Sequence, residues 1–134
     1  MNIKLSEILP IENLHGYKLH LACWNDKNHP LDVFVRSRKE WEGWNTWKGQ
    51  KNDFNRQYIF TLINFYHEPD TWLFGGIYEV MSRGTKNYSH SYKLELLENT
   101  QNLIGRLKIR LKRPGRAKAV KLENYYGNII VSEV

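Results

Sequence analysis

The sequence has little cysteine and no long apolar run. Cys23 is the only cysteine in 134 residues, so no disulfide can form within the chain and a reducing cytoplasm is the expected compartment. No apolar stretch approaches the ~20 residues that a membrane-spanning helix requires. Residues Met1 to Lys4 lack the apolar core of a signal peptide. We therefore expect a soluble cytoplasmic protein with no membrane partner.

The sequence also lacks the usual signals of catalysis. The five histidines are scattered, and none pairs with Cys23 or a carboxylate at a metal-ligand spacing. Neither a Gly-x-Ser-x-Gly elbow nor a phosphate-binding glycine-rich loop is present. Pro69-Asp70 could begin a metal-nuclease motif, but the Glu-x-Lys that should follow does not occur anywhere. We expect no catalytic residue, metal or cofactor in this chain.

Positive charge, in contrast, is concentrated in one segment. The chain has 20 Lys and Arg against 14 Asp and Glu, a net charge of +6. Residues Arg106 to Lys121 contain eight basic side chains and no acidic one, which leaves 12 basic and 14 acidic residues elsewhere. The rest of the chain is thus close to neutral, at −2. Such a concentration favours an anionic partner.

The basic segment begins with a strict alternation of basic and apolar residues from Arg106 to Lys112. In a β-strand this alternation buries Leu107, Ile109 and Leu111 and leaves the cations on the opposite face. Successive cations would lie about 6.7 Å apart, a spacing suited to a nucleic-acid backbone. The alternative is an outer strand whose lysines keep a sheet edge soluble. The predicted phosphate-binding residues are Arg106, Lys108, Arg110, Lys112, Arg113, Arg116 and Lys118.

Tryptophans provide a second candidate surface. Trp41, Trp44 and Trp47 recur at every third residue, so on a helix or a 3₁₀ turn they would share one side. An indole face accepts a nucleobase by stacking, worth ~1–3 kcal/mol per base. The alternative is that these large side chains fill the core of a small domain. The predicted base-binding residues are the stacking walls Trp24, Trp44, Trp47 and Trp72 and the edge readers Asn25 and Asp70.

Strand patterns dominate the chain and predict an α+β fold. The predicted strands are Tyr17 to Trp24, Tyr58 to Tyr66, Trp72 to Met81, Tyr88 to Leu97, Arg106 to Lys112 and Asn128 to Val134. Residues Ser82 to Asn87 would form a hairpin loop, and short helices are predicted at Leu5 to Leu9 and at about Arg38 to Trp47. We expect one domain over residues 1–134, a small and mostly antiparallel β-barrel of about six strands.

Several blocks of the sequence resemble a bacterial family. The blocks are Trp44 to Arg56, Tyr58 to Phe60, Asp70 to Gly76, Ile104 to Ile109 and Asn128 to Glu133. They are similar to the region that precedes the catalytic domain in proteins of the GIY-YIG nuclease family. The resemblance implies a DNA-recognition module, with the nuclease domain following Val134. The strand order and the tryptophan-rich cleft also resemble the PUA-like superfamily (SRA, YTH and EVE domains), whose members hold a flipped, often modified, base.

The tripeptide Gly76-Ile77-Tyr78 spells only half of the nuclease signature. The matching Tyr-Ile-Gly is missing, because Tyr88-Ser89-His90 stands where it should follow. The tripeptide is therefore predicted to be part of a strand. We predict a nucleic-acid-binding module, with duplex DNA as its partner, that reads a base, modified or flipped, for a restriction-type nuclease. The alternatives are a stand-alone metal-dependent nuclease and a protein-interaction domain.

Overall fold

A computed structural model describes residues 3–22, 47–49, 54–65, 68–86, 89–115 and 119–134, with the main chain alone at 47–49, 85–86 and 89–91. Within these residues the protein forms a nine-stranded sheet, one short α-helix and four 3₁₀ turns. The predicted α+β class is confirmed. None of the helices in this part of the chain is long and apolar enough to cross a membrane.

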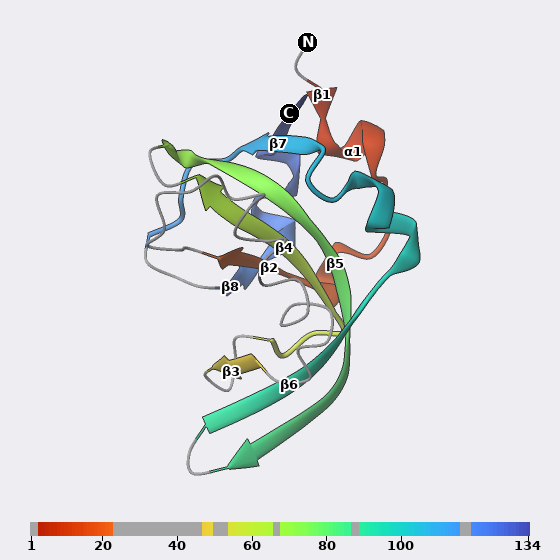
Figure 1. Cartoon of the computed structure of the whole chain (residues 1–134), viewed down its shortest axis with the longest axis vertical. Helices are drawn as coiled ribbons and strands as arrows, with labels where there is room; N and C mark the ends of the chain where they lie inside the picture. Colours follow the sequence, from red (N-terminus) through yellow and green to blue (C-terminus); the bar gives the residue numbers. More distant parts are fainter. Residues whose placement is uncertain (1–2, 23–46, 50–53, 66–67, 87–88, 116–118) are drawn as a thin grey trace.

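The strands are β1 (Ile3–Lys4), β2 (Tyr17–Ala22), β3 (Trp47–Gly49), β4 (Tyr58–Phe65), β5 (Glu68–Lys86), β6 (Ser89–Leu96), β7 (Leu107–Arg110), β8 (Ala119–Lys121) and β9 (Ile130–Glu133). The helix is α1 (Leu5–Ile8), and the 3₁₀ turns are η1 (Leu14–Gly16), η2 (Glu98–Leu103), η3 (Leu122–Asn124) and η4 (Tyr126–Asn128). The order across the sheet is β1-β9-β7-β5-β4-β2-β8, and β6 pairs with β5 and β3 (Figure 1). β2 and β4 are parallel, and the other pairs are antiparallel. Among the described strands β1 and β8 end this path without pairing with each other, so the sheet is open.

β5 connects the sheet, because it pairs with β4, β6 and β7 at different points along its 19 residues. It bends strongly and, with β6, extends beyond the other strands (Figure 1). The pairing of β5 with β4 contains a β-bulge, where Phe60 pairs with Ile77 but Leu62 pairs with Phe74. Gly76 lies in this bulge with a φ of 100°. Only glycine adopts such a φ readily, so the glycine predicted to lie in a strand also permits its bulge.

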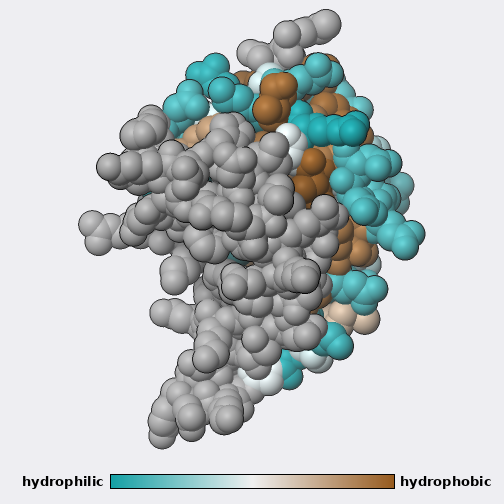
Figure 2. All heavy atoms as spheres, in the orientation of Figure 1, coloured by the Kyte–Doolittle hydropathy of each residue, from teal (hydrophilic) through white to brown (hydrophobic). Residues whose placement is uncertain are grey.

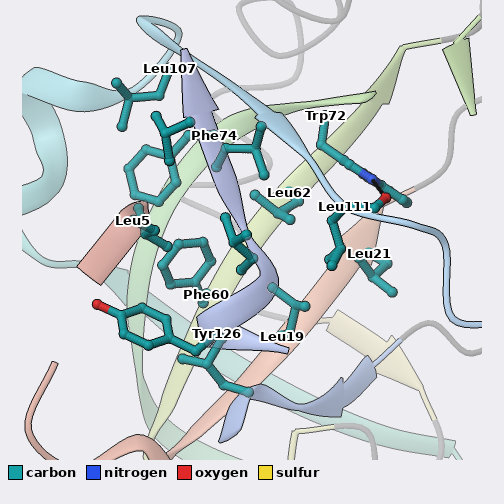
Figure 3. Packing of buried hydrophobic residues seen from close by; sticks show 14 of the residues in the cluster. Leu5, Leu19, Leu21, Phe60, Leu62, Trp72, Phe74, Leu107, Leu111 and Tyr126 are labelled. Atoms are coloured by element: carbon teal, nitrogen blue, oxygen red, sulfur yellow. Dashed lines mark hydrogen bonds between the residues drawn. The ribbon is translucent and has the colours of Figure 1, made fainter. Parts of the chain in front are cut away.

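The main core lies between the sheet and the helical turns, and Figure 3 shows its packed side chains. Its buried members include Leu5, Leu19, Phe60, Leu62, Trp72, Phe74, Ile109, Leu122, Ile129 and Val131. A second cluster contains Phe54, Ile59, Tyr78, Val80, Tyr92 and Leu94. Neighbouring residues of β4 thus enter different clusters, which explains why this strand reads as a continuous apolar run rather than an alternating one.

Several predicted elements are confirmed and others need correction. The strands at 17–22, 58–65, 107–110 and 130–133 and the turn of helix at 5–8 lie where the sequence predicts them. The predicted loop at 82–87 is wrong, because residues 82–86 continue β5 and pair with β6. The predicted helix at 38–47 lies outside the described residues except at Trp47, which belongs to β3. Around α1 and η2, the described surface mixes hydrophilic and hydrophobic side chains (Figure 2).

Candidate nucleic-acid interface

β7 carries the predicted alternation of buried and exposed side chains. Leu107, Ile109 and Leu111 are buried, whereas Arg110 and Lys112 are exposed. The strand lies inside the sheet, because it pairs with β5 on one side and β9 on the other. This position contradicts the alternative that the cations protect a free sheet edge. The charge therefore needs another explanation.

A cleft of about 670 Å³ opens beside the end of β7. We call it the basic cleft; its lining residues are Asp70, Arg110, Leu111, Lys112, Arg113, Pro114, Tyr125, Asn128 and Ile130. Three of the predicted phosphate-binding cations and one predicted edge reader thus share one concave surface. They come from β7, the loop after it and the start of β5, and further lining residues come from η4, the residue before it and β9.

Main-chain contacts fix the cationic side of the cleft. Arg110 is paired with Thr71 of β5 and Ile130 of β9 in the sheet register. Beyond the strand, the Leu111 amide donates to the Asp70 carbonyl at 3.0 Å. The Arg113 amide donates to Oδ1 of Asp70 at 3.1 Å. The segment from Leu111 to Arg113 is therefore attached to Asp70 at two points, which holds its exposed cations at the cleft.

Arg106 and Lys108 lie outside the basic cleft. Arg106 is exposed in the turn before β7. Lys108 is half-buried, with its Nζ 3.8 Å from Oε2 of Glu68 and 5.4 Å from the ring centre of Phe65. The carboxylate partly neutralises this lysine, so it is a weaker candidate for a phosphate contact than Arg110.

Trp72 is not a base-stacking wall. Its side chain is 0% exposed in the main core, and its Nε1 donates to the Leu111 carbonyl at 2.9 Å (Figure 3). A base cannot reach either face of this indole without unfolding the core around it. The residue instead supports the basic cleft from below, since Leu111 is part of the cleft lining.

The other predicted residues lie largely outside the described part of the chain. This holds for Trp24, Asn25, Trp44, Arg116 and Lys118, and for the side chain of Trp47, whose main chain belongs to β3. Their predicted roles stay predictions.

Sequence reasoning missed Tyr125 and Asn128, which also line the basic cleft. Tyr125 is half-buried and Asn128 is exposed. The signal was present as the run Tyr125-Tyr126-Gly127-Asn128, an aromatic pair followed by a turn glycine and an amide. Three residues separate the run from the end of the basic segment at Lys121, so the two could have been considered together.

A second charged cluster lies away from the cleft and joins distant parts of the chain. Arg56 Nη1 lies 2.8 and 3.0 Å from the two carboxylate oxygens of Glu123 and donates to the Tyr17 carbonyl at 3.0 Å. His15 Nδ1 is 2.6 Å from Oε2 of the same carboxylate. The hydrogen bond from Arg56 lowers the pKa of Glu123 below its ordinary value. With both side chains only 16% exposed, Arg56 is committed to this pair rather than to a ligand.

Among the residues that the structure describes, no three His, Cys, Asp or Glu side chains gather where they could hold a metal ion. A scan against protein-family models, a search of curated proteins and a search of solved structures each found no match. Function must therefore be inferred from the basic cleft.

Proposed function

We propose that this chain binds nucleic acid, with phosphates held in the basic cleft by Arg110, Lys112 and Arg113. The observation that supports the proposal is the shared cleft lined by these cations and by Asp70, which the sequence alone assigns to the same ligand. Exposed Lys and Arg side chains neutralise phosphates and release their counterions, which supplies most of the sequence-independent affinity for DNA.

Two features favour an anionic ligand over a protein partner at this surface. The cleft lining has three cations against one carboxylate, whereas the central part of a protein interface is poor in charged residues. Neither Arg110 nor Lys112 makes a side-chain hydrogen bond or ion pair within the described residues, so their charge does not serve the fold there.

We further propose that the module reads a base of duplex DNA, modified or flipped, for a restriction-type nuclease domain of the GIY-YIG family. Support for this part comes from the sequence blocks that resemble the region preceding the catalytic domain of that family. A PUA-like barrel is the proposed complete architecture, and the strong bend of β5 is the kind of curvature that such a closure requires.

Charge reversal at the cleft tests the proposal. The double variant Arg110→Glu/Lys112→Glu should weaken binding to a labelled DNA duplex irrespective of its sequence. The slope of log K against log salt should become shallower by about 0.9 for each phosphate that the protein no longer neutralises. Fluorescence anisotropy at several salt concentrations measures both effects.

The matched control is Lys93→Glu/Lys121→Glu, which makes the same charge change at two exposed residues outside the cleft lining. It should keep the slope of the unaltered protein. Circular dichroism checks that both double variants are folded. If their salt slopes are equal, the basic cleft is not the phosphate site, and a protein-interaction surface is favoured instead.

A further inference from the structure

The basic cleft contains groups that phosphate binding does not need. Asp70 contributes a carboxylate, Asn128 an amide and Tyr125 an aromatic ring. A carboxylate among phosphate-binding cations repels an anion. The hydrogen bond that the Asp70 carboxylate accepts from the Arg113 amide leaves it with acceptor capacity for a donor on the ligand. Along a DNA strand, the hydrogen-bond donors are the amino and imino groups of the bases.

We propose that the basic cleft takes one unpaired guanine, with Asp70 accepting from the base. The inference rests on the proposed function and names the nucleotide that the same site prefers.

The Asp70 carboxylate is held in place and still has free acceptor capacity. Its Oδ1 accepts the Arg113 amide at 3.1 Å, which orients the group at the mouth of the loop. Within the described residues no other hydrogen bond or ion pair reaches this carboxylate. An ionised carboxylate is an acceptor only and can take two parallel hydrogen bonds, so it matches a base edge with two adjacent donors.

Guanine fits this set of groups better than the other bases. Its N1–H and N2–H₂ are neighbouring donors, whereas adenine and cytosine offer one amino group and thymine one imino group at the same edge. The O6 and N7 acceptors of guanine suit the Arg side chains and the Asn128 amide on the other walls. The cleft volume of about 670 Å³ is sufficient for a nucleotide.

The guanine must be unpaired, because N1 and N2 are the atoms that pair with cytosine in a duplex. A single strand or a base flipped out of its stack exposes them, and Tyr125 supplies a ring on which such a base can stack. The cleft therefore suits the recognition of a single exposed base rather than of base edges in a groove of duplex DNA.

Binding of short single strands to the full chain tests the inference. The probes are labelled thymidine decamers that carry one central guanine, one central inosine or only thymine. Inosine lacks the N2 amino group and is otherwise the same as guanine. The unaltered protein should bind the guanine strand about tenfold more tightly than the inosine strand.

Asp70→Asn is the informative variant, because an asparagine oxygen can still accept the Arg113 amide and keep the loop in place. It should abolish the difference between guanine and inosine while affinity for the all-thymine strand stays equal or rises. Tyr125→Leu should weaken binding of all three strands by a similar factor and keep their order. Thermal denaturation of each variant checks that the fold is retained.

Retention of the guanine preference by Asp70→Asn would overturn the inference. Salt-dependent binding by the unaltered protein without any preference between guanine and inosine would also overturn it, while leaving the proposed function intact. If no strand binds and no duplex binds either, the proposed function fails, and the inference fails with it.

Discussion

Trp72 illustrates what a residue type can and cannot tell from sequence. An indole is equally suited to stack on a base and to fill a core, and local sequence does not distinguish the two. The deciding contact is with Leu111, 39 positions along the chain, through a strand pairing that the sequence does not specify. For Asp70 the outcome differs from that for Trp72. Its carboxylate follows a proline and belongs to no metal motif, but it is exposed and lies in the basic cleft.

Replacing Trp72 by Phe should lower the free energy of unfolding by about 2 kcal/mol, because the Leu111 carbonyl loses its donor and the core loses volume. Urea denaturation followed by circular dichroism gives the difference. Binding of DNA, measured at a temperature where the variant is folded, should change little. If the variant is as stable as the unaltered protein but no longer binds DNA, Trp72 belongs to the binding site after all.

At the scale of single elements, β7 was predictable, whereas β5 was predictable only in its central part, where a strand was expected over Trp72 to Met81. The alternation in β7 is contained within seven consecutive residues, so its faces follow from the sequence alone. β5 contains Ser82, Arg83 and Gly84, which are typical of a loop, yet the chain stays extended because β6 pairs with it throughout. Arg83 adds hydrogen bonds to the Phe54 and Arg56 carbonyls, and these tertiary contacts override the local turn signal.

The bulge in β5 predicts a penalty for any side chain at Gly76. An alanine there would keep a φ of 100° and place its Cβ 2.9 Å from Leu96 Cδ1 and 3.0 Å from Ile104 Cδ1. Gly76→Ala should therefore cost about 1–3 kcal/mol of stability. The matched control is Gly127→Ala, where nothing lies within 4 Å of the added Cβ and the change should stay within about 0.5 kcal/mol. Similar melting temperatures for the two variants would show that the strand does not depend on this glycine.

Across the whole molecule, the Arg56–Glu123–His15 cluster connects η1, the segment before β4 and η3. The lowered pKa of Glu123 makes this connection pH-dependent. A carboxyl whose pKa is depressed in the folded state stabilises the fold above its unfolded pKa, and the stabilisation is lost as the pH falls through the folded value.

Glu123→Gln should destabilise the protein at neutral pH by about 1–3 kcal/mol, the usual contribution of hydrogen bonds to a charged group. The difference from the unaltered protein should shrink as the pH falls below the carboxyl's ordinary pKa of 4.5 and through its depressed value. Denaturation curves at a series of pH values measure it, with the exposed Glu12→Gln as the control. A difference that stays constant into acid would mean that the carboxylate charge is irrelevant to the cluster.

The candidate site was predictable only on its cationic side. The basic residues are consecutive in sequence, so their concentration is visible without a fold. Tyr125 and Asn128 join them only because β9 lies beside β7 in the sheet and places η4 next to the loop that follows β7. A wall assembled by strand order cannot be read from composition or spacing, and the same limit applies to Arg56, whose partner Glu123 is 67 positions away.

The position of β9 between β1 and β7 also decides when the basic cleft is completed during synthesis. Asp70 leaves the ribosome 58 residues before Asn128 does. At about 5–20 residues per second, Asp70 is made roughly 3–12 seconds before Asn128. The cations of the cleft lie 15–18 residues before Asn128 and are made about 1–4 seconds before it. Until then β7 has an unpaired edge and its cations lack the partner surface, so a nascent chain should be unable to select a base. The proposed base selectivity would therefore be acquired last, after most of the sheet has been made.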